Sequence, residues 1–204
     1  RFRYNESERE TNPLQIDEVI RLKAKKVDGF IGGQFLPALI TDIIISMDDQ
    51  YLFLSAWLFG EIHQYTGLQD DHLRMVGRIR VGGMLIVSPT STIKVIDDDD
   101  DDEPTMMIHS NICGKKIRGG PQMLQLSLDG RRLYCTNSLY STWDAEFYPD
   151  MYHNGSQLFK ININNDRLEL DEQFVVDFGD EPNGPTLAHE MRYPNGDCTS
   201  DIWI

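Results

Sequence analysis

The chain has 204 residues, 40% of them hydrophobic, which is enough for a globular core. Nineteen Lys and Arg against 33 Asp and Glu give a net charge of -14, which repels nucleic acid and anionic membrane surfaces. No apolar run reaches the about 18 residues that a membrane-spanning helix needs. We therefore expect no nucleic-acid partner and no transmembrane segment.

The three cysteines, Cys113, Cys135 and Cys198, are odd in number and have no CxxC spacing. This pattern argues against a disulfide framework and against a structural zinc site. We expect a cytoplasmic location, with the nucleus and the membrane periphery as alternatives. The chain begins at Arg1 without a signal peptide, and we interpret it as part of a longer protein.

Short strands bounded by Gly, Pro, Asn or Asp are predicted along most of the chain, and no long amphipathic helix is predicted. Outside the repeat described next, the candidate strands in chain order are 17–22, 73–79, 84–87, 91–96, 105–110 and 173–178. Trp57, Trp143 and Trp203 stand at strand ends, where we expect them to fill the core rather than to form a substrate cage.

An internal repeat joins two stretches of the chain. "ISMDDQYLFLSAW" begins at Ile45 and "LSLDGRRLYCTNS" begins at Leu126, so that Ser46 matches Ser127, 81 residues later. Each copy reads as a strand, a tight turn and a second strand, followed by a third strand, "EIHQYT" in one case and "SQLFKINI" in the other. Repeated antiparallel units of this kind are typical of β-propeller blades.

The repeat predicts an all-β fold built as a partial β-propeller. The strand density amounts to about three blades, and we expect a ring of about seven. Residues 1–204 would then be the C-terminal half of a longer single-domain chain. Within it, residues 97–103 carry seven consecutive acids, which repel one another and predict an acidic surface loop.

The stretch "LAHEMRYPNGDC" (187–198) is close to the His-Glu-x-x-His zinc signature, but Tyr193 stands where the second histidine would be. Pro194 and the Asn195-Gly196 pair also exclude the helix that this signature requires. We expect the stretch to begin as a short strand and to leave through a turn.

Three longer segments resemble the C-terminal half of the selenium-binding protein family, whose members include methanethiol oxidases. They are "LPALITDIIISMDDQYLFLSAWLFGEIHQY", "GGPQMLQLSLDGRRLYCTNSLYSTWDAEFYPDM" and "VDFGDEPNGPTLAHEMRYPNGDCTSDIWI". The resemblance covers residues 16–204 and implies a β-propeller of roughly twice this length. It also implies that the family's selenium-associated cysteine lies in the N-terminal half, so any association with selenium would pass through that missing half.

The resemblance implies oxidation of methanethiol with O2 and water to formaldehyde, hydrogen sulfide and hydrogen peroxide. It also implies copper, an ion that combines thiolate affinity with redox chemistry. The partners would be methanethiol, O2 and the missing N-terminal half of the propeller. The alternative is a non-catalytic selenium-binding scaffold for protein interactions or intracellular protein transport.

Among the five histidines, His189 lies in the shared motif and is the candidate metal ligand, with hydrogen bonding near the propeller centre as the alternative. Glu190 would orient its imidazole or pair with Arg192. Cys198 would be a reactive thiol or a buried inert one. His63 departs from the family pattern, whose histidine stands four positions earlier, at Phe59. The sequence assigns no catalytic residue.

Overall fold

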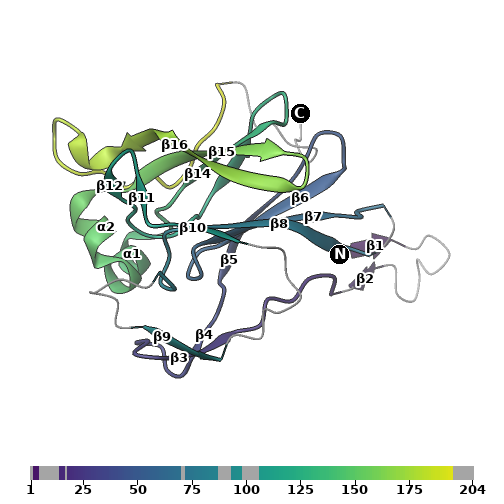
Figure 1. Ribbon diagram of the computed structural model, residues 1–204, viewed down its shortest axis with the longest axis horizontal. Coiled ribbons are helices and arrows are strands. Elements are labelled where there is room, and N and C mark those ends of the chain that lie inside the picture. Colours follow the sequence, from purple (N-terminus) through teal and green to yellow (C-terminus); the bar gives the residue numbers. More distant parts are fainter. Residues whose placement is uncertain are drawn as a thin grey trace.

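The computed structural model describes residues 2–4, 14–16, 18–69, 72–86, 93–97 and 106–194. β-Strands are the main regular structure of the described residues, and two short helices, α1 (Ser141–Phe147) and α2 (Pro149–Asn154), interrupt them. Figure 1 shows two sheets lying one above the other, with the helices at one end. The prediction of a mostly β protein is therefore confirmed.

The first sheet has five strands, and all neighbours are antiparallel except the β10 and β8 pair. In spatial order the strands are β10 (Met107–His109), β8 (Arg74–Val81), β7 (Glu61–Thr66), β6 (Tyr51–Ala56) and β5 (Ile40–Ile45). Strands β6 and β7 are buried on both faces, because the second sheet covers one face and the segment around residues 20–22 packs against the other.

The second sheet has four antiparallel strands in sequence order. They are β13 (Leu124–Leu126), β14 (Arg132–Thr136), β15 (Gln157–Asn164) and β16 (Arg167–Asp177). Buried and half-buried side chains alternate along β15, which places Phe159 and Ile161 on the face toward the first sheet. Both repeated stretches thus form antiparallel sheets of the predicted strand order.

The repeat extends to the hydrogen bonds of the turns. The Ser46 hydroxyl lies 2.6 Å from a carboxylate oxygen of Asp48, and the Ser127 hydroxyl lies 2.5 Å from that of Asp129. Each serine hydroxyl oxygen also accepts a backbone N–H from the first residue of the next strand, Tyr51 at 2.9 Å or Arg132 at 3.1 Å. The same local chemistry therefore builds both hairpins.

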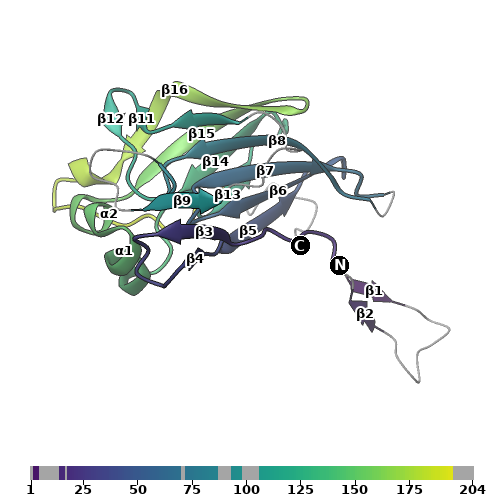
Figure 2. The same cartoon turned by 60° about the horizontal axis from the view of Figure 1, so that its bottom comes forward.

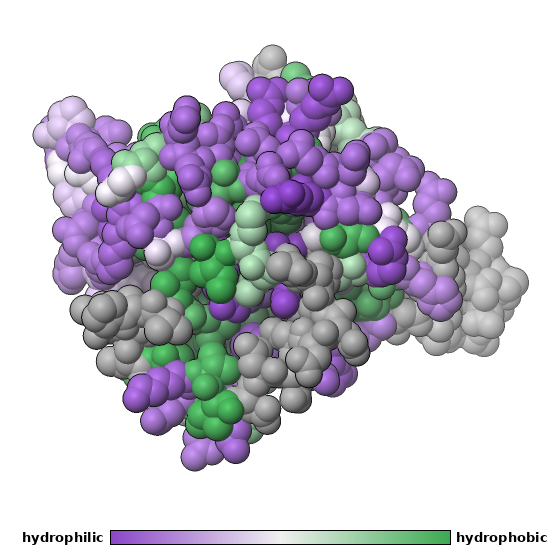
Figure 3. Space-filling view, viewed as in Figure 1, coloured by the Kyte–Doolittle hydropathy of each residue, from purple (hydrophilic) through white to green (hydrophobic). Residues whose placement is uncertain are grey.

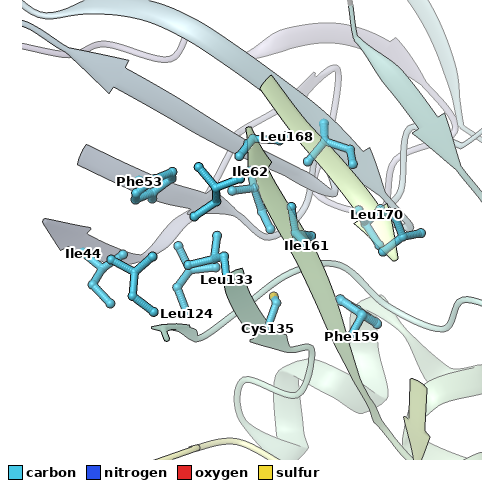
Figure 4. Packing of buried hydrophobic residues seen from close by; sticks show 14 of the residues in the cluster. Ile44, Phe53, Ile62, Leu124, Leu133, Cys135, Phe159, Ile161, Leu168 and Leu170 are labelled. Atoms are coloured by element: carbon cyan, nitrogen blue, oxygen red, sulfur yellow. The ribbon is translucent and has the colours of Figure 1, made fainter. Parts of the chain in front are cut away.

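The main core lies between the two sheets (Figure 4). The first sheet contributes Phe53 and Ile62, and the second contributes Leu133, Phe159 and Ile161, none more than 1% exposed. Full burial of side chains of this size is worth about 1.5–3 kcal/mol each. This burial fixes the strand register, because a shift by one residue would turn the apolar set to the other face.

A second cluster surrounds Trp57 at the end of β6 that lies toward the helices. The Trp57 indole N–H donates to the Asn137 carbonyl at 3.1 Å, and the Tyr148 hydroxyl donates to the Trp57 carbonyl at 2.7 Å. The rings of Trp57 and Tyr148 pack edge to face, with their centroids 4.8 Å apart. Trp57 fills the core as predicted. Trp143 on α1 does not, because 43% of it is exposed.

Three smaller sheets complete the described chain. They are β4 (Phe35–Leu36), β3 (Lys25–Asp28) and β9 (Lys94–Asp97) in one sheet, β11 (Asn111–Ile112) with β12 (Lys115–Lys116), and β1 (Phe2–Tyr4) with β2 (Leu14–Ile16). Figure 2 shows β3, β4 and β9 in front of the end of β5. Figure 3, drawn in the view of Figure 1, shows hydrophobic residues gathered at the surface in the lower half of the picture. Phe35, Ile40, Ile43 and Ile96 are among the exposed apolar side chains of these strands.

Some local predictions are wrong. Residues 18–22 and 84–86 form no strand, and at the second place Gly82 and Gly83 both adopt positive φ, which ends β8 in a turn. Of the acidic stretch 97–103, Asp97 is the last residue of β9, and the prediction of a loop over 98–103 falls outside the described residues.

Candidate functional site

His189 lies in an irregular segment that runs past the end of β14. The predicted strand is absent, because residues 187–192 form no ladder, but no helix forms either. Side chains hold the segment instead. The Thr136 hydroxyl donates to the His189 carbonyl at 2.8 Å, and the Ala188 N–H donates to the Ser156 hydroxyl at 2.5 Å. These contacts attach the segment to the second sheet.

The imidazole of His189 is exposed but held in place. Its Nδ1 lies 3.2 Å from the Ser138 carbonyl oxygen, and its ring stacks on Tyr140 with centroids 5.7 Å apart and planes 25° apart. Because a carbonyl only accepts hydrogen bonds, this contact assigns the proton of the neutral ring to Nδ1 and the lone pair to Nε2. An imidazole in this tautomer is able to bind a metal ion through Nε2.

A fully buried carboxylate lies behind this contact. Asp144, in the first turn of α1, accepts a hydrogen bond from the Ser138 hydroxyl at 2.7 Å and from the Leu139 N–H at 3.0 Å. Burial raises the pKa of Asp144, although these two hydrogen bonds oppose the rise. The 138–140 turn therefore connects a buried carboxyl group to the candidate ligand.

Neighbouring candidates have other contacts or lie outside the described residues. Glu190 pairs with Arg192 at 2.5 Å, which is the alternative to orienting His189. Cys198 belongs to the part that the structure does not describe. Among the described residues no group of three or more His, Cys, Asp or Glu side chains is arranged to hold a metal ion. The described residues therefore offer His189 no set of side chains that would hold a metal ion with it.

His63 is buried and forms part of a polar network on the first sheet. Its Nε2 lies 2.7 Å from Glu61, whose other carboxylate oxygen accepts from Arg80 at 2.5 Å, and its Nδ1 lies 3.3 Å from the Tyr65 hydroxyl. Glu61 and Arg80 face each other across β7 and β8. Burial raises the pKa of Glu61, but His63 and Arg80 outweigh it and hold that pKa below its ordinary value. Each of these groups has a protein partner, which favours a structural role.

The outer face of the second sheet carries an open apolar cavity of about 330 Å³. Tyr134, Leu158 and Phe174 line it from the sheet, and Met191 lines it from the segment that follows His189. The cavity therefore adjoins the segment that contains the candidate ligand.

Ser138, Tyr140 and Asp144 are not among the residues that the sequence pattern singles out. One signal was available, since Ser141 and Asp144 have the Ser-x-x-Asp spacing that often opens a helix. That signal predicts the helix start, but not the contact with a histidine 51 residues away from Ser138.

The amino-acid sequence of this chain is similar to those of several curated proteins. It is 48% identical over 191 residues to the methanethiol oxidase of Xenopus tropicalis, an alignment that covers 92% of this chain and 39% of that protein. It is 47% identical over 188 residues to selenium-binding protein 1 of Arabidopsis thaliana, covering 91% of this chain and 37% of that protein. The chain thus spans about two fifths of the length of these curated relatives.

A solved structure agrees with this likeness. The X-ray structure of a hypothetical selenium-binding protein from Sulfolobus tokodaii matches with a TM-score of 0.73 and 32% identity, covering 100% of this chain and 39% of that one. The family model for the 56kDa selenium binding protein (SBP56) matches residues 2–204. The resemblance inferred from the sequence is confirmed, and the chain belongs to the selenium-binding protein family.

Proposed function

We propose that this chain is part of a methanethiol oxidase, which converts methanethiol, O2 and water to formaldehyde, hydrogen sulfide and hydrogen peroxide. The observation that carries the proposal is the 48% identity over 191 residues to a protein named methanethiol oxidase. Because the chain spans 39% of that relative, the complete reaction would need the rest of the protein. On its own this chain would be inactive.

We further propose that the two repeated sheets are adjacent blades of a β-propeller, within about three blades of a ring of about seven. Strands β5 and β13 lie next to each other, as neighbouring inner strands of two blades would. The outward faces support the proposal as well. Ile43 on the first sheet is 54% exposed, and the apolar cavity opens on the second. Further blades from the missing N-terminal half would cover both faces.

Among the described residues, His189 is the copper ligand that we propose. His189 would hold the ion through Nε2, because its Nδ1–H is engaged by the Ser138 carbonyl, and imidazole is a suitable copper ligand. The copper would supply redox chemistry between a thiolate and O2. The remaining ligands would come from parts of the protein beyond the described residues. The Tyr140 ring would keep the imidazole in this orientation.

The second candidate function is a non-catalytic scaffold that binds selenium or carries other proteins. The names of relatives such as selenium-binding protein 1 favour it. The two candidates differ in the need for a metal and for O2. Any selenium association would reside in the missing half. The described residues contain no helix long and apolar enough to cross a membrane. The cytoplasmic location stays a proposal that rests on the odd number and the spacing of the cysteines.

The decisive test measures product formation and metal content on one preparation of the protein that carries this chain. The oxidase proposal predicts bound copper, together with peroxide and formaldehyde that form only when both methanethiol and O2 are present. Copper-free protein without methanethiol-dependent peroxide would support the scaffold. An anaerobic sample is the matched control, because it keeps substrate and metal and removes only the oxidant.

A further inference from the structure

The first strand of the second sheet is attached to the first sheet by two side chains. The Ser55 hydroxyl, on β6, donates to the Gln122 carbonyl at 2.6 Å. The Asp42 carboxylate, on β5, accepts the Leu124 N–H at 2.7 Å. Leu124 is the first residue of β13, so these two contacts place the beginning of one sheet against the sheet that precedes it.

The same two contacts recur one sheet later. In the 81-residue repeat the corresponding pairs are Ser55 with Thr136 and Asp42 with Met123. The Thr136 hydroxyl donates to the His189 carbonyl at 2.8 Å, and the Met123 sulfur accepts the Met191 N–H at 3.3 Å. The two backbone groups held in this way are two residues apart in both cases. His189 and Met191 therefore lie on the second sheet as the beginning of β13 lies on the first.

The apolar cavity lies on the matching face of the second sheet. In the first sheet, one side chain from each of four strands packs against the second sheet: Ile44, Phe53, Ile62 and Ile79 (Figure 4). The corresponding residues of the second sheet are Gln125, Tyr134, Leu158 and Val176. The first two matches follow from the repeat, and the last two follow from the pairing of the strands. All four line the cavity.

The two faces differ in exposure. The four positions of the first sheet are at most 4% exposed, because the second sheet covers them. On the second sheet Leu158 is half-buried and Val176 is 40% exposed. Met191 and Tyr193, from the segment 189–193, line the same cavity. The segment and the open face thus have the arrangement of the covered interface, with the covering strands missing.

We propose that the segment 189–193 is the first strand of a third large sheet, and that the cavity is the surface on which the rest of that sheet packs. The occupant is an antiparallel sheet from the part of the protein outside this chain, since the chain spans 39% of its relative from Xenopus tropicalis. Its facing side is apolar, with a polar group opposite the Tyr134 hydroxyl, because Tyr134 stands where the first sheet has Phe53. This inference rests on the proposed propeller, but it needs neither copper nor oxidase activity.

The experiment introduces single cysteines into the protein that carries this chain and follows their reaction with iodoacetamide by peptide mapping. Val176→Cys should react more than about 10-fold more slowly than Leu128→Cys, because a covered thiol reacts only when the structure opens. Leu128 is 77% exposed and does not line the cavity. Ile79→Cys is the matched control, since Ile79 corresponds to Val176 and is 0% exposed beneath the second sheet.

The inference is overturned if folded Val176→Cys reacts as fast as Leu128→Cys. Should Val176→Cys fail to fold, Leu158→Cys decides by the same comparison. Protection that disappears when the protein is diluted would also overturn the inference, because the cover would then be a second copy of the protein. Failure of the proposed oxidase is distinguishable, since the labelling uses no methanethiol and no added copper. Absent peroxide formation with protected Val176→Cys would remove the oxidase and keep the third sheet.

Discussion

The indole N–H of Trp57 donates to the carbonyl of Asn137, 80 residues further along the chain, at 3.1 Å. This bond joins the end of β6 to the residue after β14, so it links the two repeated sheets at the end near the helices. Both partners are fully buried, so this hydrogen bond satisfies two polar groups that lie in the interior.

We expect Trp57→Phe to lower the free energy of unfolding by about 1–3 kcal/mol, because it leaves a buried carbonyl without its donor. Trp57→Ala should cost about 3–5 kcal/mol through the added cavity. Urea unfolding measures both. Trp143→Phe, at a position 43% exposed, is the control and should cost less than about 1 kcal/mol. Equal losses at Trp57 and Trp143 would contradict this account of the cluster.

The two serine turns should contribute equally to stability. Ser46→Ala and Ser127→Ala each remove a hydroxyl that donates to an aspartate and accepts a backbone N–H, so each should cost about 1–2 kcal/mol in urea unfolding. Exposed Ser141→Ala should change stability little. A large loss of unfolding free energy at one turn and none at the other would show that the two turns share their hydrogen bonds but not their contribution to stability.

The Glu61 network should make stability depend on acid. Because His63 and Arg80 hold the folded pKa of Glu61 below its ordinary value of 4.5, its contribution is present above that pH and is lost as the pH falls through the folded pKa. Glu61→Gln should have a lower free energy of unfolding than the wild type at pH 7. As the pH falls, it should lose less of that free energy than the wild type does. The measurement is unfolding free energy against pH, with exposed Glu146→Gln as control. If the unfolding free energies of wild type and Glu61→Gln fell in parallel below pH 4.5, the prediction would be refuted.

The two described cysteines should differ in reactivity. Burial raises the pKa of the Cys135 thiol, which is 0% exposed, whereas Cys113 is exposed. Iodoacetamide should therefore label Cys113 in the folded protein and Cys135 only after unfolding, as peptide mapping by mass spectrometry would report. Rapid labelling of Cys135 in native buffer would be inconsistent with the packing between the sheets.

Local chemistry made part of the fold predictable. Each Ser-x-Asp turn and the apolar strands beside it are formed by residues that are close together in the sequence, so both hairpins could be predicted from the sequence. The short helix α1 could not be placed, because seven residues give little periodicity. The 187–192 segment forms no strand, since side chains of Thr136 and Ser156 satisfy its backbone in place of a neighbouring strand.

The candidate site was predictable only in its central residue. His189 stood out because of its motif, but its environment is formed by Ser138, Tyr140 and Asp144, which are about 50 residues earlier in the chain. They lie near it because β14 and β16 both pair with β15. No spacing rule connects residues across such a distance. The buried carboxylate and its turn therefore required the structure.

Copper content of the His189→Ala protein tests the central claim most directly. Elemental analysis of wild type, His189→Ala and the control His72→Ala, which removes an exposed imidazole elsewhere, should give equal copper for wild type and His72→Ala. His189→Ala should lose most of its copper and its methanethiol-dependent peroxide formation while keeping its unfolding midpoint, because one donor is lost and no core volume. A folded His189→Ala protein with the copper content and peroxide formation of the wild type would contradict the account.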